Sequence, residues 1–262
     1  MITKLIEDAR KIIVKFGSNT LANSEGKINT ALLHEFSEQI AAFIHRGKQI
    51  VIVSSGAQVA GLSTLDKWER KKDIHYRQAL CAVGQVELMG AWRRAFEQHN
   101  LHIGQILLTR EDFKDSNRTL NMRNTLFTLV DEGIIPIINE NDTVSVEEIK
   151  IGDNDTLAAQ SAILWSADLL ILFSDIDGVY DKNPKDHKDA ALVEEIWNID
   201  EIRKNISIGS TNNFGTGGIA TKLDAAQMAL SYGIPTILAN GGKERSLETL
   251  AAGHQKATAF LA

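Results

Sequence analysis

The sequence has little of several features that mark secreted and membrane proteins. It holds one cysteine, Cys81, so no disulfide can form within the chain. No stretch approaches the roughly 20 apolar residues that a membrane-spanning helix requires, and the charged start MITKLIEDARK does not resemble a signal peptide. These absences lead us to expect a cytoplasmic protein with no membrane partner.

Positive charge is also scarce. The chain carries 28 lysines and arginines against 34 aspartates and glutamates, which gives a formal net charge of −6. Domains that bind nucleic acid broadly are usually basic, so we expect no nucleic-acid partner. An anionic ligand would have to be held by local backbone amides and a few well-placed lysines.

The sequence also has few prolines and lacks recognisable linkers. Three prolines occur in 262 residues, and there is no Gly/Ser-rich linker, low-complexity run or repeat of 20–50 residues. Domains of the α/β class often reach roughly 200–250 residues as one unit. We therefore expect residues 1–262 to form a single domain.

What the sequence does contain is an alternation of short apolar runs and longer amphipathic stretches. The short runs are rich in Ile and Val and almost continuously apolar, which is typical of parallel strands covered on both faces. The alternation predicts an open α/β sheet with right-handed crossovers. One different segment, VSVEEIKI at 144–151, alternates in polarity and favours a hairpin arm at the rim of the sheet. The predicted strands are 11–16, 49–54, 102–108, 134–139, 169–174 and 234–239, and the predicted helices are 30–46, 75–99, 119–132, 155–166 and 221–232.

Four of the predicted strands end in polar, turn-forming residues. Ligands of open α/β sheets bind beyond the carboxyl ends of the strands. Turn formation alone explains one or two such clusters, whereas four at the same kind of position predict a binding site. The clusters are KFGSN at 15–19, SSGA at 54–57, NEND at 139–142 and SDIDG at 174–178.

Single residues in these clusters have two interpretations each. Lys15, followed by Gly17, is either an ammonium group in a phosphate pocket, where glycine lets backbone amides approach, or a lysine that extends to solvent at a strand edge. Ser55, just before a helical stretch, belongs either to an anion site at a helix N-terminus or to an ordinary N-cap. Taken one at a time, these residues leave both interpretations open.

The segment 140–155 concentrates negative charge, with six carboxylates and one lysine, Lys150. Such a cluster suits an ammonium group, a magnesium ion or the orientation of catalytic lysines. Asp153, Asn154 and Asp155 also stand where the following helix needs an N-cap. Two aspartates and an asparagine exceed what a cap requires, so we favour a functional role.

The stretch GTGGIATK at 215–222 gathers groups that bind polyphosphate. Glycines flank Thr216, and Lys222 follows at the start of a predicted helix, so backbone amides, a hydroxyl and an ammonium group converge there. The spacing is not that of a P-loop. A dinucleotide fingerprint needs a strand directly before the glycines and an acid at the end of the next strand, where Asn240 stands instead. We therefore set aside a nicotinamide-dependent oxidoreductase.

Taken together, the motifs KFGSNTL, VIVSSGAQVAG, PIINENDTV, IKIGDNDTLAA, FSDIDGVY and GTGGIATK resemble the amino acid kinase family, and within it the enzymes that act on L-glutamate. They run in order from Lys11 to about Ala262, and INEND, GDND and GTGG-x-x-TK are the most specific. The resemblance implies a three-layer α/β sandwich around an open, mostly parallel sheet. It implies phosphorylation of the γ-carboxylate of L-glutamate by ATP with Mg²⁺, the first step of proline biosynthesis. It also leads us to expect the catalytic domain alone, without the C-terminal accessory domain, similar to one in RNA-modification enzymes, that many relatives carry.

The resemblance assigns roles to individual residues, with glutamate bound by the N-terminal part of the chain and ATP by the C-terminal part. Lys15 would contact the transferring phosphate, Lys222 would stabilise charge as the bond to ADP breaks, and Asp155 would orient both lysines. The glutamate-binding positions match Ser55, Asp142 and Asn154, with Asn139, Lys150 and Asp153 in the same pocket. The nucleotide-binding positions match Lys15, Gly17, Ser174, Asp175, Thr216, Gly217, Gly218, Ile219, Ala220, Thr221 and Lys222.

Two alternatives stay open. Another kinase of this family would act on acetylglutamate, aspartate, carbamate, a nucleoside monophosphate or isopentenyl phosphate. A sensor that keeps the fold would bind proline or glutamate without catalysis, although it would need neither the two lysines nor the acidic triplet 153–155. The resemblance further implies a homo-oligomer, either a dimer or a tetramer, and feedback inhibition by proline.

Overall fold

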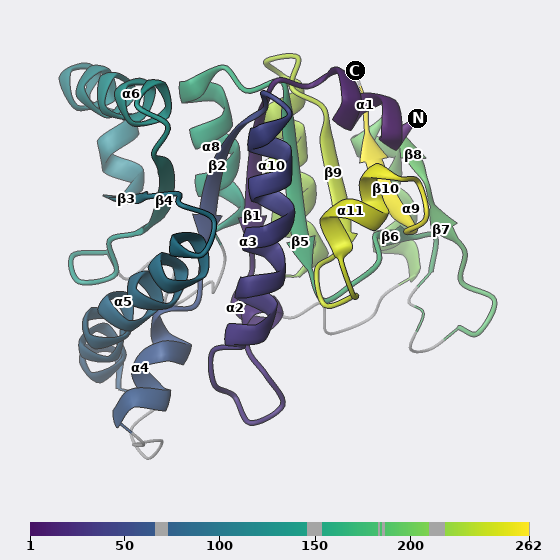
Figure 1. Cartoon of the computed structure of the whole chain (residues 1–262). Coiled ribbons are helices and arrows are strands. Elements are labelled where there is room, and N and C mark those ends of the chain that lie inside the picture. The colour runs from purple at the N-terminus through teal and green to yellow at the C-terminus, as the bar shows by residue number, and fades with distance from the viewer. Residues whose placement is uncertain (66–72, 146–153, 183, 185–186, 210–217, 262) are drawn as a thin grey trace.

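The computed structural model describes residues 1–65, 73–145, 154–182, 184, 187–209 and 218–261 (Figure 1). Within this part of the chain, eight strands form a central sheet in the order β3-β4-β2-β1-β5-β9-β10-β8. The six strands from β3 to β9 in this order are parallel to one another, whereas β10 runs antiparallel to β9 and parallel to β8. The strands are β1 Lys11–Phe16, β2 Gln49–Ser54, β3 Ile103–Leu108, β4 Ile135–Glu140, β5 Leu169–Ser174, β8 Glu195–Ile196, β9 Thr236–Asn240 and β10 Ala257–Phe260; a separate antiparallel ribbon pairs β6 Val179–Tyr180 with β7 Leu192–Val193.

Helices cover both faces of the sheet, so the molecule has three layers (Figure 1). Alternate residues of each strand enter different cores: Val14 packs into the core on one face, and Ile13 into the core on the other. This arrangement confirms the predicted three-layer, mostly parallel α/β sandwich. The first core is covered by α1 Ile2–Asp8, α2 Ser18–Leu21, α3 Thr30–His45, α4 Ala57–Leu65, α5 Ile74–Glu97 and α11 Ser246–Ala251, and the second by α6 Ser116–Asp131, α8 Asp155–Trp165, α9 Ile199–Gly209 and α10 Ile219–Leu230; the short helix η1 Arg110–Phe113 precedes α6.

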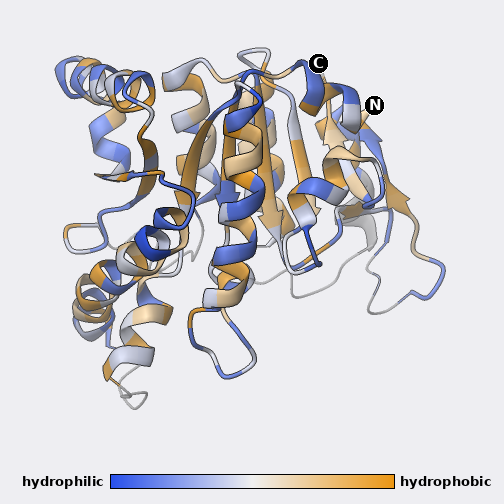
Figure 2. Ribbon diagram, viewed as in Figure 1, coloured by the Kyte–Doolittle hydropathy of each residue, from blue (hydrophilic) through white to orange (hydrophobic). Residues whose placement is uncertain are grey.

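The six predicted strands match observed strands to within two residues, and the five predicted helices match to within three. Five of these six strands, all except the edge strand β3, are buried on both faces, which is why they read as continuous apolar runs and form the orange centre of Figure 2. Cys81 is buried in α5, as expected for an inert thiol. The predicted hairpin arm at 144–151 lies, from residue 146 onward, outside the described residues. In the described part of the chain, no helix is long and apolar enough to cross a membrane.

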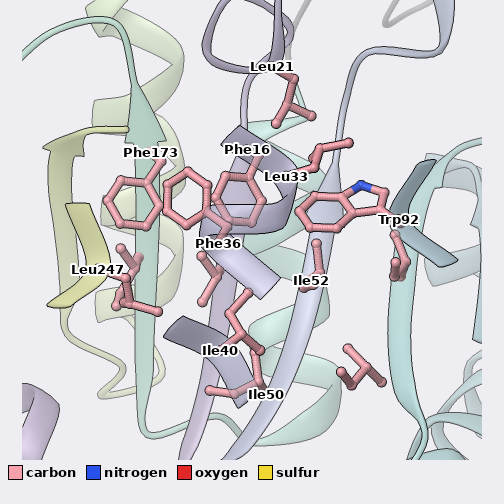
Figure 3. Packing of buried hydrophobic residues seen from close by; sticks show 14 of the residues in the cluster. Phe16, Leu21, Leu33, Phe36, Ile40, Ile50, Ile52, Trp92, Phe173 and Leu247 are labelled. Carbon is pink, nitrogen blue, oxygen red and sulfur yellow. The ribbon is translucent and has the colours of Figure 1, made fainter. Parts of the chain in front are cut away.

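A row of aromatic rings supports the carboxyl ends of three strands (Figure 3). The ring centroids of Phe16 and Phe36 lie 4.5 Å apart, those of Phe36 and Phe173 lie 5.2 Å apart, and those of Phe16 and Trp92 lie 5.5 Å apart. Phe16 ends β1, and Phe173 is the penultimate residue of β5. Trp92 also donates a hydrogen bond of 2.9 Å from Nε1 to Oγ of Ser54, the last residue of β2. The row therefore fixes the ends of β1, β2 and β5 relative to one another.

Helices α4 and α5 touch through two glycines with no side chain between the backbones. A Cβ atom at Gly84 of α5 would lie 1.7 Å from the carbonyl oxygen of Ala57, and a Cβ atom at Gly61 of α4 would lie 2.0 Å from the carbonyl oxygen of Leu80. Both distances are far below contact distance, so only glycine fits at these positions. The close approach brings the middle of α5 against the first turn of α4, directly after β2.

This contact gives a stability prediction with a matched control. We expect Gly84→Ala to lower the free energy of unfolding by about 3 kcal/mol or more, because the backbone of α4 would have to move. In the same helix, a Cβ atom at Gly90 would meet only the flexible end of Arg94 at 3.2 Å, so Gly90→Ala should be neutral or stabilise the protein by up to about 1 kcal/mol. Denaturant unfolding of both variants tests this pair, and equal effects would contradict the proposed backbone contact.

Candidate active site

The strand order gathers the predicted polar clusters at one edge of the sheet. β1 lies at the centre, with β2 on one side and β5 on the other. The chain therefore leaves β1 in one direction and later returns on the opposite side through α8. Such a switch point in an open parallel sheet is where ligands bind, beyond the carboxyl ends of the strands.

Three charged side chains meet at this point. Nζ of Lys15 lies 2.6 Å from Oδ1 of Asp155, and Nζ of Lys222 lies 2.9 Å from Oδ2 of the same carboxylate. Lys15 is 3% exposed, Lys222 6% and Asp155 0%. One buried carboxylate therefore holds two buried ammonium groups.

Local structure explains how three distant segments supply this centre. Lys15 is two residues beyond Ile13 in β1, so its side chain points to the same face, which α8 and α10 cover. Asp155 is the first residue of α8, and Lys222 lies in the first turn of α10, which begins after Gly218. Oγ1 of Thr221 donates to Oδ2 of Asp155 at 3.3 Å and so strengthens the link between the two helices.

The electrostatics of the centre favour an anionic ligand. Two positive charges against one negative charge leave a net positive charge among these three side chains. Burying charge away from water is costly unless it is compensated. The N-termini of α8 and α10 add the positive ends of two helix dipoles at the same place. A phosphate group would complete the compensation.

Gly17 lies close to the Lys15 ammonium group at the end of β1. A Cβ atom at Gly17 would lie 3.6 Å from Nζ of Lys15, so any longer side chain at this position would cover it. The backbone N–H of Gly17 donates to the carbonyl oxygen of Phe173 at 3.4 Å, which joins the ends of β1 and β5.

A chain of buried side-chain amides leads from this centre toward α5. Nδ2 of Asn154 donates to Oδ1 of Asn139 at 2.7 Å, and Nδ2 of Asn139 donates to Oε1 of Gln85 at 2.8 Å. Asn154 occupies the N-cap position of α8 but makes no capping bond with its side chain. The side chain therefore belongs to the amide chain and does not cap the helix.

Ser55 lies at the end of β2, beside the amide chain. Its backbone N–H donates to the carbonyl oxygen of Phe16 at 3.0 Å, and its hydroxyl group is buried without a hydrogen-bond partner in the described part of the chain. Gly56 follows with a φ of 109°, a left-handed conformation that favours glycine. Asp142, just after β4, is also buried, and its carbonyl oxygen accepts a hydrogen bond of 3.1 Å from Nε2 of Gln78.

The predicted nucleotide residues lie on the other side of β1. Ser174 ends β5, and its hydroxyl group donates to Oδ1 of the exposed Asp175 at 3.1 Å. Nδ2 of Asn19 donates to Oδ2 of Asp175 at 3.4 Å, so the turns after β1 and β5 are joined. Gly218, Ile219, Ala220 and Thr221 form the start of α10 beside Lys222.

Asp177, in the turn after β5, ties this turn to the end of β9. Burial would raise the pKa of Asp177, but hydrogen bonds from Lys243 and Asn240 outweigh this effect and hold the pKa below its usual value. Because the pKa is lowered in the folded protein, the resulting stabilisation is present at neutral pH and is lost as the pH falls through the folded-state pKa. The turn is therefore firmly held at neutral pH.

The structure brings together most of the residues predicted from the sequence and adds two. Lys150, Asp153, Thr216 and Gly217 lie outside the described residues, so their placement stays a prediction. Gln85 and Trp92 were not predicted. A single buried glutamine at the centre of a helix carries no periodic signal. Trp92 resembles an ordinary core residue in the sequence, and only the structure shows the hydrogen bond from its indole N–H to Ser54. 

Metal binding by protein side chains alone has no support in the described ranges. They contain no group of three or more histidine, cysteine, aspartate or glutamate residues that could hold a metal ion. Mg²⁺ typically binds through one or two carboxylates together with substrate phosphates. The carboxylates of the described residues therefore fit an ion that binds together with substrate phosphates.

Comparisons with known proteins agree with this geometry. The model of the amino acid kinase family matches residues 10–240. The chain is 64% identical over 262 residues to the glutamate 5-kinase of Alkaliphilus metalliredigens, covering 100% of this chain and 99% of that protein. It is 58% identical to the glutamate 5-kinase of Alkaliphilus oremlandii, covering 99% of each. Among solved structures, the UMP kinase from Ureaplasma parvum superposes with a TM-score of 0.67 at 17% identity, over 97% of this chain and 99% of that one, and so shares the fold.

Proposed function

The chain belongs to the amino acid kinase family, and we propose that its reaction is the transfer of the γ-phosphoryl group of ATP to the γ-carboxylate of L-glutamate. The products are γ-glutamyl phosphate and ADP, and the reaction would be the first step of proline biosynthesis. The observation that carries the proposal is the buried Lys15–Asp155–Lys222 centre, placed between the amide chain on one side and the end of β5 on the other.

In phosphoryl transfer to a carboxylate, the protein itself forms no covalent bond to the substrates. The γ-carboxylate of glutamate is ionised at neutral pH, so no general base is required. One of its oxygens forms the new bond to the γ-phosphorus, and the bond to the β–γ bridging oxygen breaks and leaves ADP. The protein must place two anions in line and neutralise the charge that accumulates between them.

The two lysines are the groups that supply this neutralisation. Lys15, beside Gly17, would contact the transferring phosphoryl group, and Lys222, at the start of α10, would stabilise charge on the departing ADP. Asp155 would act as a positioning residue, because it contacts both ammonium groups and is itself fully buried. Their preorganised arrangement supports stabilisation of the transition state without reorganisation.

Glutamate would be bound by the part of the site that follows β2 and β4. Ser55 and Asn154 offer buried polar atoms without partners in the described part of the chain, and Asp142 adds a buried carboxylate suited to the substrate ammonium. Asn139 holds Asn154 in place. Lys150 and Asp153 stay proposed members of this pocket.

ATP would be bound by the part of the site that follows β5 and begins α10. Ser174 and Asp175 lie at the end of β5, and Gly218 to Lys222 present the N-terminus of α10 to the phosphates. Thr216 and Gly217 extend the proposed phosphate loop. Asp175 would help to hold Mg²⁺ together with the ATP phosphates, and the ion would supply positive charge there. Residues 1–262 would thus form one domain, in which the N-terminal part binds glutamate and the C-terminal part binds ATP.

One assay tests the proposed reaction directly. An acyl phosphate reacts with hydroxylamine to form a coloured hydroxamate, so γ-glutamyl phosphate can be measured as it forms. We expect hydroxamate and ADP only when glutamate, ATP and Mg²⁺ are all present. Activity with acetylglutamate, aspartate, carbamate, UMP or isopentenyl phosphate and not with glutamate would assign another kinase reaction, and glutamate binding without ADP release would assign a sensor.

Ser55→Ala tests the glutamate part of the site. The Ser55 hydroxyl makes no hydrogen bond in the described structure, so its loss should leave the melting temperature unchanged. We expect the KM for glutamate to rise about tenfold or more, because a hydrogen bond to a charged group contributes roughly 1.5–3 kcal/mol, while the KM for ATP stays near the wild-type value. Ser63→Ala in α4, whose hydroxyl donates to the carbonyl oxygen of Val59 in its own helix, is the control. A KM for glutamate equal to that of the control would exclude Ser55 from the binding site.

Regulation, assembly and location complete the proposal. We expect a homo-oligomer, a dimer or tetramer, that acts in the cytoplasm and is inhibited by proline at a site overlapping that of glutamate. Light scattering gives the mass in solution. Running the hydroxamate assay with increasing proline tests the inhibition, and an overlapping site requires that glutamate relieve it.

A further inference from the structure

Gln85 is a polar residue that is buried beside the proposed glutamate pocket. Its place in α5 gives no structural reason for an amide there. The residue lies in the middle of α5, is 8% exposed and directly follows Gly84, whose missing side chain lets α5 touch the backbone of Ala57. That contact places Gln85 next to the turn that carries Ser55. Across the sheet, Val53 of β2 pairs with Ile138 of β4, so Ser55 and Asn139 follow at the ends of neighbouring strands.

The orientation of the amide chain is fixed by one backbone group. The backbone N–H of Glu140 donates to Oδ1 of Asn139 at 2.9 Å, and a backbone N–H can only donate. Asn139 must therefore turn its oxygen toward Glu140 and its Nδ2 toward Gln85. Gln85 must therefore accept this hydrogen bond through Oε1, and Asn154 must donate to the Asn139 oxygen through Nδ2.

This fixed polarity leaves one donor and one acceptor at the two ends of the chain. Nε2 of Gln85 and Oδ1 of Asn154 are both buried and have no hydrogen-bond partner in the described part of the structure. Buried polar atoms are rarely left unsatisfied, so these two atoms indicate a ligand. The ligand must accept a hydrogen bond near Gln85 and donate one near Asn154.

The unsatisfied acceptor and donor match the two charged groups on the α-carbon of an amino acid. Asn154 precedes Asp155, so the reaction centre lies at the Asn154 end, and Gln85 lies two hydrogen bonds farther away. Glutamate bound with its γ-carboxylate at Lys15 would extend its α-carbon, which carries both the ammonium group and the α-carboxylate, toward the amide chain. The acceptor of Asn154 suits the ammonium group, and the donor of Gln85 suits the α-carboxylate.

We propose that Gln85 binds the α-carboxylate of the substrate through Nε2, and that Glu140 and Asn139 hold its amide in the donating orientation. This assignment rests on the proposed function, because it takes glutamate as the substrate. It makes Gln85 a specificity residue for the charge at the α-carbon, distinct from the lysines that handle the phosphate.

Gln85→Glu separates this role from a structural one. The variant keeps an oxygen that accepts from Asn139, but it replaces the donor with a second, negatively charged oxygen. We expect kcat/KM for glutamate to fall on the order of 100-fold, mainly through KM, because two carboxylates would then face each other. The KM for ATP and the melting temperature should change little. Gln98→Glu, the same charge change at the exposed end of α5, is the matched control.

A substrate analogue sharpens the test. L-Isoglutamine, the α-amide of glutamate, keeps the γ-carboxylate and offers an N–H donor where glutamate has the α-carboxylate. We expect wild type to prefer glutamate and Gln85→Glu to lose or reverse that preference, since the new carboxylate accepts the amide N–H. Gln85→Leu, which removes both polar atoms of the amide, should weaken the binding of glutamate without creating a preference for L-isoglutamine.

The outcomes are distinguishable. If wild type forms no hydroxamate from glutamate, the proposed function fails. If wild type is active and Gln85→Glu keeps the wild-type ratio of kcat/KM between glutamate and L-isoglutamine, Gln85 does not bind the α-carboxylate, even if the variant is slower. A changed ratio in Gln98→Glu would also overturn the assignment, because the effect would then be one of overall charge.

Discussion

Lys222→Met should lower kcat on the order of 10³-fold while leaving the fold intact. Lys222 is a buried cation at the start of α10 that we place on the departing ADP, and removing one cation from a phosphoryl-transfer site typically costs 10³-fold or more, about 4 kcal/mol of the barrier. Methionine fills a similar volume, and Asp155 keeps its contact with Lys15 at 2.6 Å. The free energy of unfolding should therefore change by only about 1 kcal/mol.

Steady-state kinetics in the hydroxamate assay measure this effect. Lys4→Met in α1, an exposed lysine that precedes the amino end of β1 and lies outside the candidate site, is the matched control and should retain wild-type kcat. A kcat for Lys222→Met within tenfold of wild type would remove Lys222 from the group that stabilises the transition state. A large fall in melting temperature would instead show that the lysine is needed for folding.

Asp155→Asn should reduce both stability and activity, in contrast to the lysine variant. The amide removes the only charge that separates Lys15 and Lys222 among these three buried side chains. Breaking a buried ion pair by removing one partner costs about 3–5 kcal/mol, and for a protein of this size that corresponds to a drop in melting temperature of roughly 10 °C. Displaced lysines should lower kcat about 10²-fold or more.

Ligand binding distinguishes this explanation from simple misfolding. A bound ATP supplies negative charge where the aspartate was lost, so ATP should raise the melting temperature of Asp155→Asn by more than it raises that of wild type. Thermal denaturation with and without ATP gives the comparison. Equal shifts in both proteins would contradict the view that Asp155 compensates the two lysines.

The fold was largely predictable because its signal is local. β1, β2 and β5 read as strands over the same residues that form them, since each is buried on both faces and therefore continuously apolar. α1 was not predicted because a seven-residue helix gives little periodic signal. α9 was not predicted although its isoleucines recur at helical spacing. β10 was missed because a four-residue strand is too short to give a clear apolar run.

The candidate site was predictable where the residue type itself carries the chemistry. Lys15, Asp155 and Lys222 stood out by charge at strand ends and helix starts, and the structure brings all three together. Gln85 did not stand out, because its role depends on which atom of Asn139 faces it. That orientation follows from the backbone N–H of Glu140, which holds the Asn139 oxygen. Asn139 lies 54 positions from Gln85 in the sequence, so only the folded chain shows the contact between them.

The three charged residues of the centre come from the beginning, middle and end of the chain, and this has a consequence for how activity appears during folding. Forming the Lys15–Asp155 contact closes a long loop, and adding Lys222 requires α10 to dock on α8. A chain still emerging from the ribosome cannot assemble the centre before α10 has been made. On refolding from denaturant, recovery of kinase activity should therefore lag behind recovery of helical signal, and so report completion of the native state.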